Sequence, residues 1–235
     1  ESMDLPDFSK APEPVNVDPD NSDIEVDVGE VAVPFLEHSI RVQGGATKCA
    51  RVFTAFLAQQ EELRAQLRGN AVLEVGSGTG LVGCALALSG AHVDLTDVDY
   101  VVEVLQANFR SNLTEELRQN SRCFELCWGE DVASEREYRA IFGSDLVYAK
   151  EAHFPLLQTF RKLGTPQTSV YFAYIHRFPW EQRFFALMDT LYNRELVQLE
   201  DGIYIFCFRP KEGARFGTGQ IDDLLEAAQI SPDES

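Results

Sequence analysis

One twelve-residue segment, VLEVGSGTGLVG at residues 72–83, narrows the possible folds of this chain more than any other. An apolar run with β-branched residues meets three closely spaced glycines, and a second apolar run follows. This order predicts a buried strand, a tight turn and a helix. Glycines let the backbone approach a ligand closely, and the start of a helix offers free N–H groups. We therefore predict that Gly76, Gly78 and Gly80 form a ligand-binding turn.

The residues around this turn narrow the choice of ligand. Residues 78–83 match the G-x-G-x-x-G pattern of dinucleotide-binding folds, and Asp97 follows about twenty residues later. An acid at the end of a second strand can bind the ribose of any nucleoside cofactor, so both NAD and S-adenosylmethionine fit Asp97. Glu74 lies inside the predicted strand, where an unpaired carboxylate is costly. It would attract the ammonium and sulfonium of S-adenosylmethionine and repel the pyrophosphate of NAD, so it favours S-adenosylmethionine.

Strands and helices alternate along most of the chain, which predicts a parallel sheet covered by helices on both faces. We expect strands at residues 71–76, 91–97, 123–128, 144–149, 168–176 and 202–210. We expect helices at residues 46–67, 80–90, 100–113, 153–163 and 179–192. Residues 24–28 and 38–43 alternate apolar and polar side chains and are expected to form a small hairpin before the main fold.

Composition limits the environment of the protein. The five cysteines are odd in number and show no C-x-x-C spacing, which favours free thiols in a reducing compartment and gives no sign of a metal site. No apolar run approaches the ~20 residues that a membrane span needs, and no signal peptide is apparent. We therefore expect a protein that is not associated with membranes and is located in the cytoplasm, with the nucleus as an alternative.

Charge is unevenly distributed along the chain. The net charge is −18, and residues 4–30 hold nine acids and one base. An acidic chain without a Lys/Arg cluster repels phosphates, which argues against a nucleic-acid partner. We expect a disordered acidic segment at residues 1–23, one folded domain at 24–210 and a flexible acidic tail at 211–235.

Four local motifs carry a resemblance to a known family. They are VLEVGSGTGLVG, AHVDLTD at 91–97, ELCWGED at 125–131 and SDLVYAKE at 144–151. They resemble motif I, the second strand, the Trp-Gly segment and the D-x-x-Y signature of the methyltransferase-like protein lysine methyltransferases. That branch belongs to the seven-β-strand class I S-adenosylmethionine-dependent methyltransferases. The resemblance implies a Rossmann-like, mostly parallel seven-stranded sheet and S-adenosylmethionine as the cofactor.

The resemblance also implies roles for individual residues. Trp128 would lie beside the adenine, Asp145 would hold the acceptor amine, and Tyr148 would help to wall the amine slot. Asp145 and Tyr148 are thus the expected catalytic residues, with no metal. The expected cofactor-binding residues are Glu74, Gly76, Ser77, Gly78, Gly80, Asp97, Trp128 and Asp145. Further on, Arg177 and Trp180 are candidates either for contacting a protein partner or for packing at the start of a helix.

One departure from the family keeps alternatives open. The branch usually carries a Trp-Asp pair in the helix before motif I, whereas Lys48 and Cys49 stand there. We predict a monomeric methyltransferase acting on the ε-nitrogen of lysine in a protein substrate. The alternatives are a scaffold that binds S-adenosylmethionine but has lost catalysis, and a methyltransferase acting on protein histidine or a small molecule. A nicotinamide oxidoreductase is opposed because no catalytic Tyr-x-x-x-Lys follows residue 151.

Overall fold

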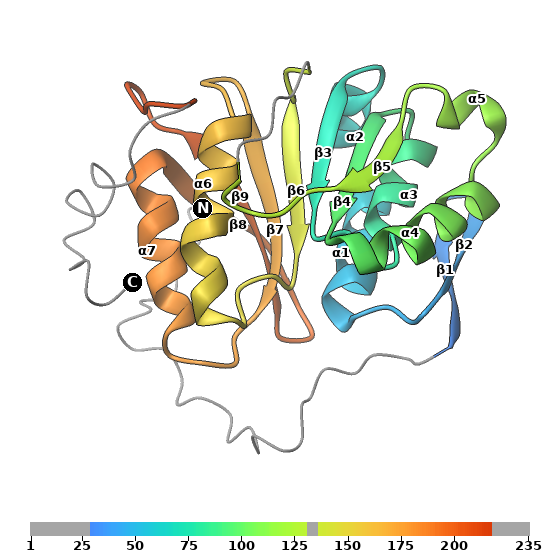
Figure 1. Cartoon of the computed structure of the whole chain (residues 1–235), viewed down its shortest axis with the longest axis horizontal. Helices are drawn as coiled ribbons and strands as arrows, with labels where there is room; N and C mark the ends of the chain where they lie inside the picture. Colours follow the sequence, from blue (N-terminus) through green and yellow to red (C-terminus); the bar gives the residue numbers. More distant parts are fainter. Residues whose placement is uncertain (1–28, 131–135, 218–235) are drawn as a thin grey trace.

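A seven-stranded sheet forms the centre of the protein and carries helices on both faces (Figure 1). The computed structural model describes residues 29–130 and 136–217. The strand order is β5-β4-β3-β6-β7-β9-β8, with parallel pairing from β5 to β7 and antiparallel pairing of β9 with both neighbours. The strands are β3 (Ala71–Val75), β4 (His92–Asp97), β5 (Arg122–Glu125), β6 (Ala140–Ser144), β7 (Ser169–Ile175), β8 (Tyr192–Glu200) and β9 (Ile203–Pro210). The predicted fold class is confirmed.

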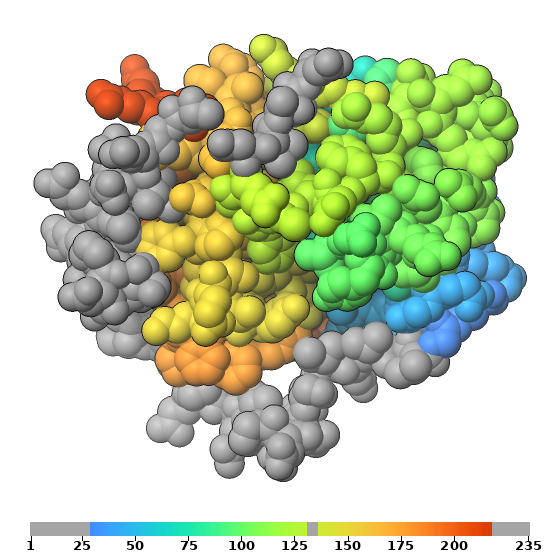
Figure 2. All heavy atoms as spheres, in the orientation of Figure 1, coloured from blue at the N-terminus to red at the C-terminus, as the bar shows by residue number. Residues whose placement is uncertain are grey.

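The helices divide between the two faces of the sheet. Five helices contribute to the core that also contains the N-terminal hairpin: α1 (Lys48–Gln59), α2 (Glu61–Leu67), α3 (Leu81–Leu88), α4 (Asp99–Asn112) and the short α5 (Glu115–Arg118). The opposite face carries α6 (His153–Leu163), preceded by a 3-10 turn (Lys150–Ala152), and α7 (Glu181–Leu191). On the face seen in Figure 2, residues 126–130, which directly follow β5, lie between α4, in green, and α6, in yellow. Within the described residues, no helix is long and apolar enough to span a membrane.

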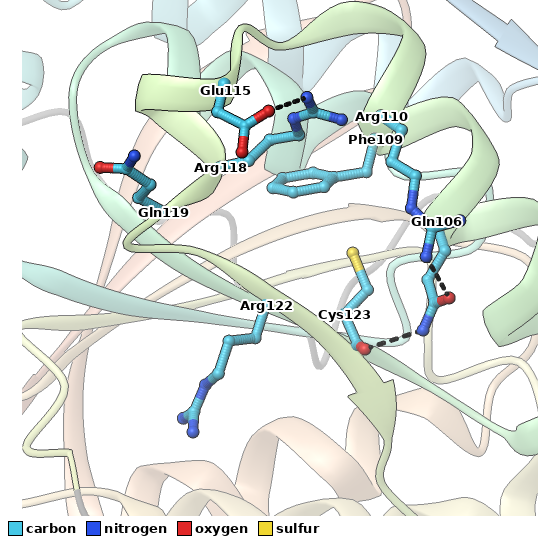
Figure 3. A pocket seen from close by; sticks show the side chains of 8 residues that line it. All are labelled: Gln106, Phe109, Arg110, Glu115, Arg118, Gln119, Arg122 and Cys123. Atoms are coloured by element: carbon cyan, nitrogen blue, oxygen red, sulfur yellow. Dashed lines mark hydrogen bonds and ion pairs between the residues drawn. The ribbon is translucent and has the colours of Figure 1, made fainter.

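A surface cleft lies at the edge of the sheet, between α4, α5 and β5 (Figure 3). It is lined by Gln106, Phe109, Arg110, Glu115, Arg118, Gln119, Arg122 and Cys123. Arg118 pairs with Glu115 at 3.4 Å, and Arg110 donates a hydrogen bond to Gln106 at 3.2 Å. The cleft therefore contains arginines whose charge is partly met by groups of the cleft itself.

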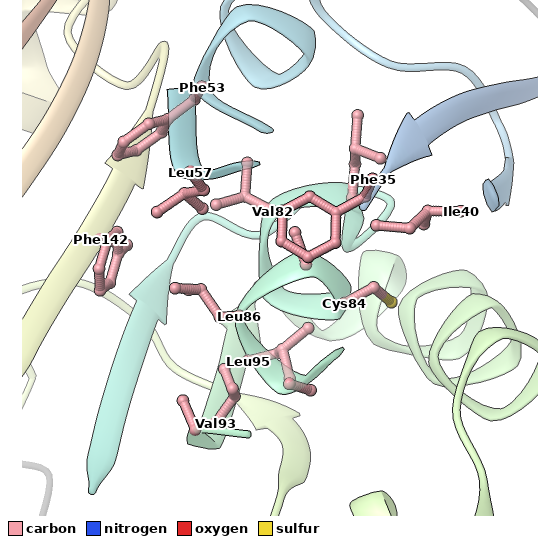
Figure 4. Packing of buried hydrophobic residues seen from close by; sticks show 14 of the residues in the cluster. Phe35, Ile40, Phe53, Leu57, Val82, Cys84, Leu86, Val93, Leu95 and Phe142 are labelled. Atoms are coloured by element: carbon pink, nitrogen blue, oxygen red, sulfur yellow. The ribbon is translucent and has the colours of Figure 1, made fainter. Parts of the chain in front are cut away.

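Successive side chains of a strand point to opposite faces of the sheet, so the protein has one hydrophobic core on each face. On β3, Val72 faces the core beneath α1 and α3, while Leu73 and Val75 face the core beneath α6 and α7. The first core joins the hairpin to the sheet: Phe35 and Ile40 pack with the residues of α1, α3 and β4 that Figure 4 labels. Burial of both sheet faces explains why the central parallel strands β3, β6 and β7 are almost continuously apolar.

The N-terminal hairpin differs in one strand from the sequence-based expectation. β2 (His38–Gln43) is the predicted strand, but its partner is β1 (Glu30–Phe35), and residues 24–28 lie outside the described part of the chain. The hairpin is connected to the sheet through α4, since the Asn108 side chain bonds both the backbone of Gln43 and the Thr79 carbonyl oxygen. It thereby supports the glycine turn from outside.

The structure differs from the prediction in the bounds of three further elements. The strand expected at 144–149 shares only Ser144 with β6 (Ala140–Ser144), which ends there because Asp145 has a φ of 61° in the left-handed region that extended backbone does not occupy. The helix expected at 46–67 divides at Gln60 into α1 and α2. The helix expected to reach residue 192 ends at Leu191, and the edge strand β8, which was not predicted, begins at the next residue. The expected segment at 1–23 and most of the one at 211–235 lie outside the described residues.

Candidate active site

The candidate site is a cleft at the carboxyl ends of β3, β4 and β6, where ligands bind in open α/β sheets. Two adjoining cavities share Thr47, Gly76, Gly78 and Ser144. The first extends along the glycine turn to Glu74, Ser77 and the start of α3. The second extends past Asp97 and Trp128 to Asp145 and Tyr148. Of the predicted site residues, only Gly80 lies outside these linings.

The glycine turn has the backbone geometry that its sequence predicts. Gly76, Gly78 and Gly80 have φ values of 62°, 53° and 84°, which residues with a side chain rarely adopt. A Cβ on Gly76 would lie 2.5 Å from Leu146 Cδ2, so this glycine also allows close packing. A Cβ on Gly78 would meet nothing within 4 Å, so the turn opens toward the cleft at this residue. Gly80 instead caps the start of α3.

Asp97 ends β4 and bonds the glycine turn directly. Its Oδ2 accepts a hydrogen bond of 2.7 Å from the Gly78 N–H, and its Oδ1 accepts one of 2.8 Å from the Val98 N–H. A carboxylate has about four lone-pair positions, so it can still accept from hydroxyl groups in the cleft. Asp97 is therefore positioned against the turn and remains available to a ribose.

Glu74 is buried at the floor of the first cavity. Its side chain is 2% exposed, and no described residue hydrogen-bonds its Oε2. Burial raises the pKa of Glu74 to about 8, while contacts with Ser77 and the Gly83 backbone oppose this rise by less. Ser144 Oγ is a second buried atom of the cleft without a partner among the described residues. The Glu74 carboxyl and the Ser144 hydroxyl are thus free to bind a polar ligand, and the carboxyl favours a cationic one.

Trp128 lies beside the glycine turn, on the side of the second cavity. Its Cζ2 lies 3.1 Å from the position of a Cβ on Gly76. The adjoining Gly129 fixes this segment to α6, because its N–H donates to Thr159 Oγ1 at 2.9 Å and its carbonyl oxygen accepts from Lys162 Nζ at 2.8 Å. The indole therefore lines the second cavity together with Asp97, and its predicted position beside an adenine stays a prediction.

At the far end of the second cavity, Asp145 is held by an arginine. The two Oδ atoms of Asp145 accept hydrogen bonds of 2.6 and 2.8 Å from the two terminal nitrogens of Arg177. The Asp145 N–H donates to the Ala173 carbonyl oxygen at 2.9 Å, so the backbone of β7 fixes its position. Tyr148 lines the same cavity and is 52% exposed, and Trp180 Nε1 donates to its carbonyl oxygen at 3.4 Å.

A buried acid organises the loop that carries Arg177. Glu181, in the first turn of α7, is fully buried. Its Oε2 accepts hydrogen bonds from the Tyr174 hydroxyl at 2.8 Å and from the N–H groups of Arg177 and Phe178 at 2.9 and 3.0 Å, and it lies 3.1 Å from His176 Nδ1. The sequence contains the signal for this cap, an acid at the start of a predicted helix, but not its partners.

Lys48 and Cys49, which stand where the family usually has a Trp-Asp pair, do not line either cavity. Lys48 Nζ donates to the Asp201 carbonyl oxygen at 3.1 Å, in the turn between β8 and β9. Cys49 is buried, and burial followed by the charge of Asp145 raises the pKa of its thiol. Thr47 lines both cavities and caps α1, with its Oγ1 accepting from the Ala50 N–H at 3.1 Å. Sequence reasoning missed this threonine.

Comparison with known proteins then identifies the family. A family model described as lysine methyltransferase matches residues 27–191. The chain belongs to the lysine methyltransferase family. Protein N-lysine methyltransferase METTL21A from Danio rerio is 33% identical over 148 residues, which are 62% of this chain and 68% of that protein. The METTL21A of Mus musculus is 32% identical and the EEF1A lysine methyltransferase 3 of Mus musculus is 31% identical, over 71% and 73% of this chain and 80% and 75% of theirs.

Solved structures agree with the fold of this lysine methyltransferase. A Thermus thermophilus 16S rRNA methyltransferase in complex with AdoMet and guanosine has a TM-score of 0.56 at 16% identity, over 77% of this chain and 50% of that chain. The magnesium protoporphyrin IX methyltransferase of Synechocystis with bound SAH has a TM-score of 0.52 at 14% identity, over 68% and 83%. The predicted family, activity and cofactor are thus confirmed: the protein is an S-adenosylmethionine-dependent lysine methyltransferase.

The residues of the cleft fit that cofactor. The Glu74 carboxyl, whose Oε2 has no partner among the described residues, suits a cationic group, Gly78 leaves open space, and Asp97 suits a ribose. The arginine cleft of Figure 3 shares no lining residue with this site. Among the described residues, no cluster of three or more His, Cys, Asp or Glu side chains could hold a metal in this lysine methyltransferase, and all five cysteines are free.

Proposed function

We propose that the protein methylates a lysine ε-amine on the surface of another protein, with the acceptor entering beside Asp145 and Tyr148. The observation that carries this proposal is that the glycine turn, Asp97 and the two residues of the D-x-x-Y signature all line one cleft. A donor held along the turn and an acceptor held by Asp145 would therefore meet inside it.

When bound, S-adenosylmethionine supplies a methyl group on a sulfonium, which a nitrogen lone pair displaces in line while the bonding electrons remain on sulfur. The protein's own contribution is to bind and orient the two partners. Glu74 and the glycine turn hold the charged end, and Asp97 holds the ribose. Asp145 accepts a hydrogen bond from the acceptor amine and so points its lone pair into the cleft.

The mouth of the cleft favours a macromolecular acceptor. Tyr100 and Tyr148 line the second cavity and are 85% and 52% exposed, and Trp180 next to Tyr148 is 40% exposed. Exposed aromatic side chains are enriched at protein–protein contacts, because they bury much area with little loss of side-chain entropy. A rim of three such residues suits a protein surface better than a small amine.

Transfer of a radiolabelled methyl group from S-adenosylmethionine into a cell extract tests the proposal. We expect discrete labelled protein bands that disappear with Asp145→Ala. Glu116→Ala, which removes an exposed acid on α5, serves as the matched control and should leave the bands intact. Hydrolysis of a labelled band should yield methyl-lysine. Methyl-histidine, label confined to small molecules, or bands that survive Asp145→Ala would each contradict the proposal.

A further inference from the structure

The pair formed by Asp145 and Arg177 is buried at the acceptor end of the cleft. The two side chains are 8% and 10% exposed. Both terminal nitrogens of the guanidinium face both carboxylate oxygens, which is the strongest geometry for this type of pair. Burial alone would lower the pKa of Arg177, but hydrogen bonds to Asp145 and the charge of that carboxylate raise it above its ordinary value. The arginine therefore carries a permanent positive charge against the aspartate.

The position of Arg177 is set by its neighbours rather than by the aspartate alone. Glu181 binds the backbone N–H groups of Arg177 and Phe178, and this fixes the loop between β7 and α7. Asp145 is fixed independently by its unusual φ of 61° and its backbone hydrogen bond to Ala173. Two separately anchored residues thus meet, and the pair is preorganised.

We propose that Arg177 is a positioning residue that keeps the acceptor end of the cleft electrically neutral, so that the site admits an uncharged amine in preference to an ammonium. This inference rests on the proposed function, because it assumes that the acceptor nitrogen enters beside Asp145. It assigns Arg177 to the acceptor site itself, whereas the sequence suggested either contact with a protein partner or packing at the start of a helix.

Simple electrostatics explains the need for such a residue. A lone buried carboxylate would attract a cation and hold the proton on an incoming lysine, whose reference pKa is near 10.4. An ammonium has no lone pair and cannot accept a methyl group. With Arg177 in place the pair has no net charge, yet the aspartate keeps lone pairs that can accept from a neutral N–H. Orientation is retained while the stabilisation of the ammonium is removed.

The test compares two cofactor analogues that differ at the point of transfer. S-Adenosylhomocysteine has an uncharged sulfur there, whereas sinefungin carries an amine that is protonated at neutral pH. The measured quantity is the ratio of their dissociation constants by isothermal titration calorimetry at pH 7. A general loss of folding or of the cofactor site weakens both ligands and leaves the ratio unchanged, so the ratio reports only the charge near the transfer point.

Substitutions of Arg177 and Asp145 are expected to change this ratio in opposite directions. Arg177→Gln should strengthen sinefungin relative to S-adenosylhomocysteine by about tenfold or more, because unit charges about 4 Å apart interact by about 1 kcal/mol even in bulk water and by more where solvent is partly excluded. Asp145→Asn should weaken sinefungin by a similar factor. Arg177→Lys, which keeps the charge but not the fork, should restore a ratio near that of the unchanged protein. The double variant Asp145→Asn/Arg177→Gln should do the same.

A ratio that stays constant in both single variants, with S-adenosylhomocysteine still bound, would overturn the role of Arg177. So would equal behaviour of the lysine and glutamine variants. Failure of the proposed function has a different signature, since it leaves the extract unlabelled while the analogue ratios still respond. Either single variant is sufficient if the other does not fold, because their expected shifts have opposite signs.

Discussion

Glu74 gives the sharpest prediction, because its substitution by glutamine should change how stability depends on pH. The side chain is buried, and its Oε2 has no hydrogen-bond partner among the described residues. Glutamine has nearly the same shape as a protonated glutamate but cannot ionise. The variant therefore removes one titration and little else.

The magnitude follows from the raised pKa. Burial moves the pKa of Glu74 from 4.5 to about 8, and at about 1.4 kcal/mol for each pH unit this amounts to roughly 5 kcal/mol. Below pH 4.5 the carboxyl is protonated in both the folded and the unfolded chain, so it adds no pH dependence. Between pH 4.5 and 8 the unfolded chain loses this proton while the folded protein keeps it. The free energy of unfolding therefore falls as pH rises, and the loss is complete above pH 8.

Urea unfolding at pH 5, 6.5 and 8 tests this expectation. Glu74→Gln should gain stability relative to the unchanged protein as pH rises, by several kcal/mol between pH 5 and pH 8. The comparison cancels the titration of all other groups. Glu116→Gln is the control, because it removes the same charge from an exposed position and should show no such gain. A difference between Glu74→Gln and the unchanged protein that is constant from pH 5 to pH 8 would refute the reasoning.

Three other substitutions have defined outcomes. Asp97→Asn should weaken S-adenosylhomocysteine by about tenfold in calorimetry, because it removes a charged acceptor for the ribose, and unchanged affinity would place the ribose elsewhere. Gly83→Ala would put a Cβ 2.2 Å from Leu95 Cδ2, so we expect a loss of about 2 kcal/mol in urea unfolding, and a neutral effect would contradict the close packing. Glu181→Ala leaves the Tyr174 hydroxyl and neighbouring N–H groups without their acceptor, and should cost about 3 kcal/mol in the same assay. Wild-type stability there would mean that water replaces the carboxylate.

The sequence predicts well that the glycine turn and the end of β4 line one cleft, because the signals for this are local. The glycines and Asp97 follow directly from two apolar strands, and the parallel sheet brings the ends of those strands together. The strand predicted at 144–149 was placed too late in the chain: β6 begins at Ala140, and apolar residues continue past its end, at Leu146 and Val147. Only the left-handed backbone at Asp145 marks the true end, and hydrophobic periodicity carries no information about a single φ angle.

The end of the cleft at Asp145 depends on contacts that the sequence does not encode locally. Asp145 and Arg177 are 32 positions apart and meet because β6 and β7 are neighbours in the sheet. The edge strand β8 escaped prediction for a related reason: its half-buried residues have no clear alternation, and they directly follow α7. A pattern of period two or 3.6 cannot be read where both faces of an element are partly exposed.

The two most buried acids of the cleft, Glu74 and Asp145, have opposite electrostatic surroundings. In the described part of the chain no cation lies beside Glu74, and burial keeps its proton near neutral pH, whereas Asp145 is matched by Arg177. On the proposed function this difference has a reason. The donor brings a permanent charge that Glu74 can bind by giving up its proton, while the acceptor must arrive without one. An arginine beside Glu74 would cancel its attraction for the donor, and the absence of one beside Asp145 would retain the acceptor as an ammonium. The placement of a single guanidinium therefore assigns donor and acceptor to the two ends of the cleft.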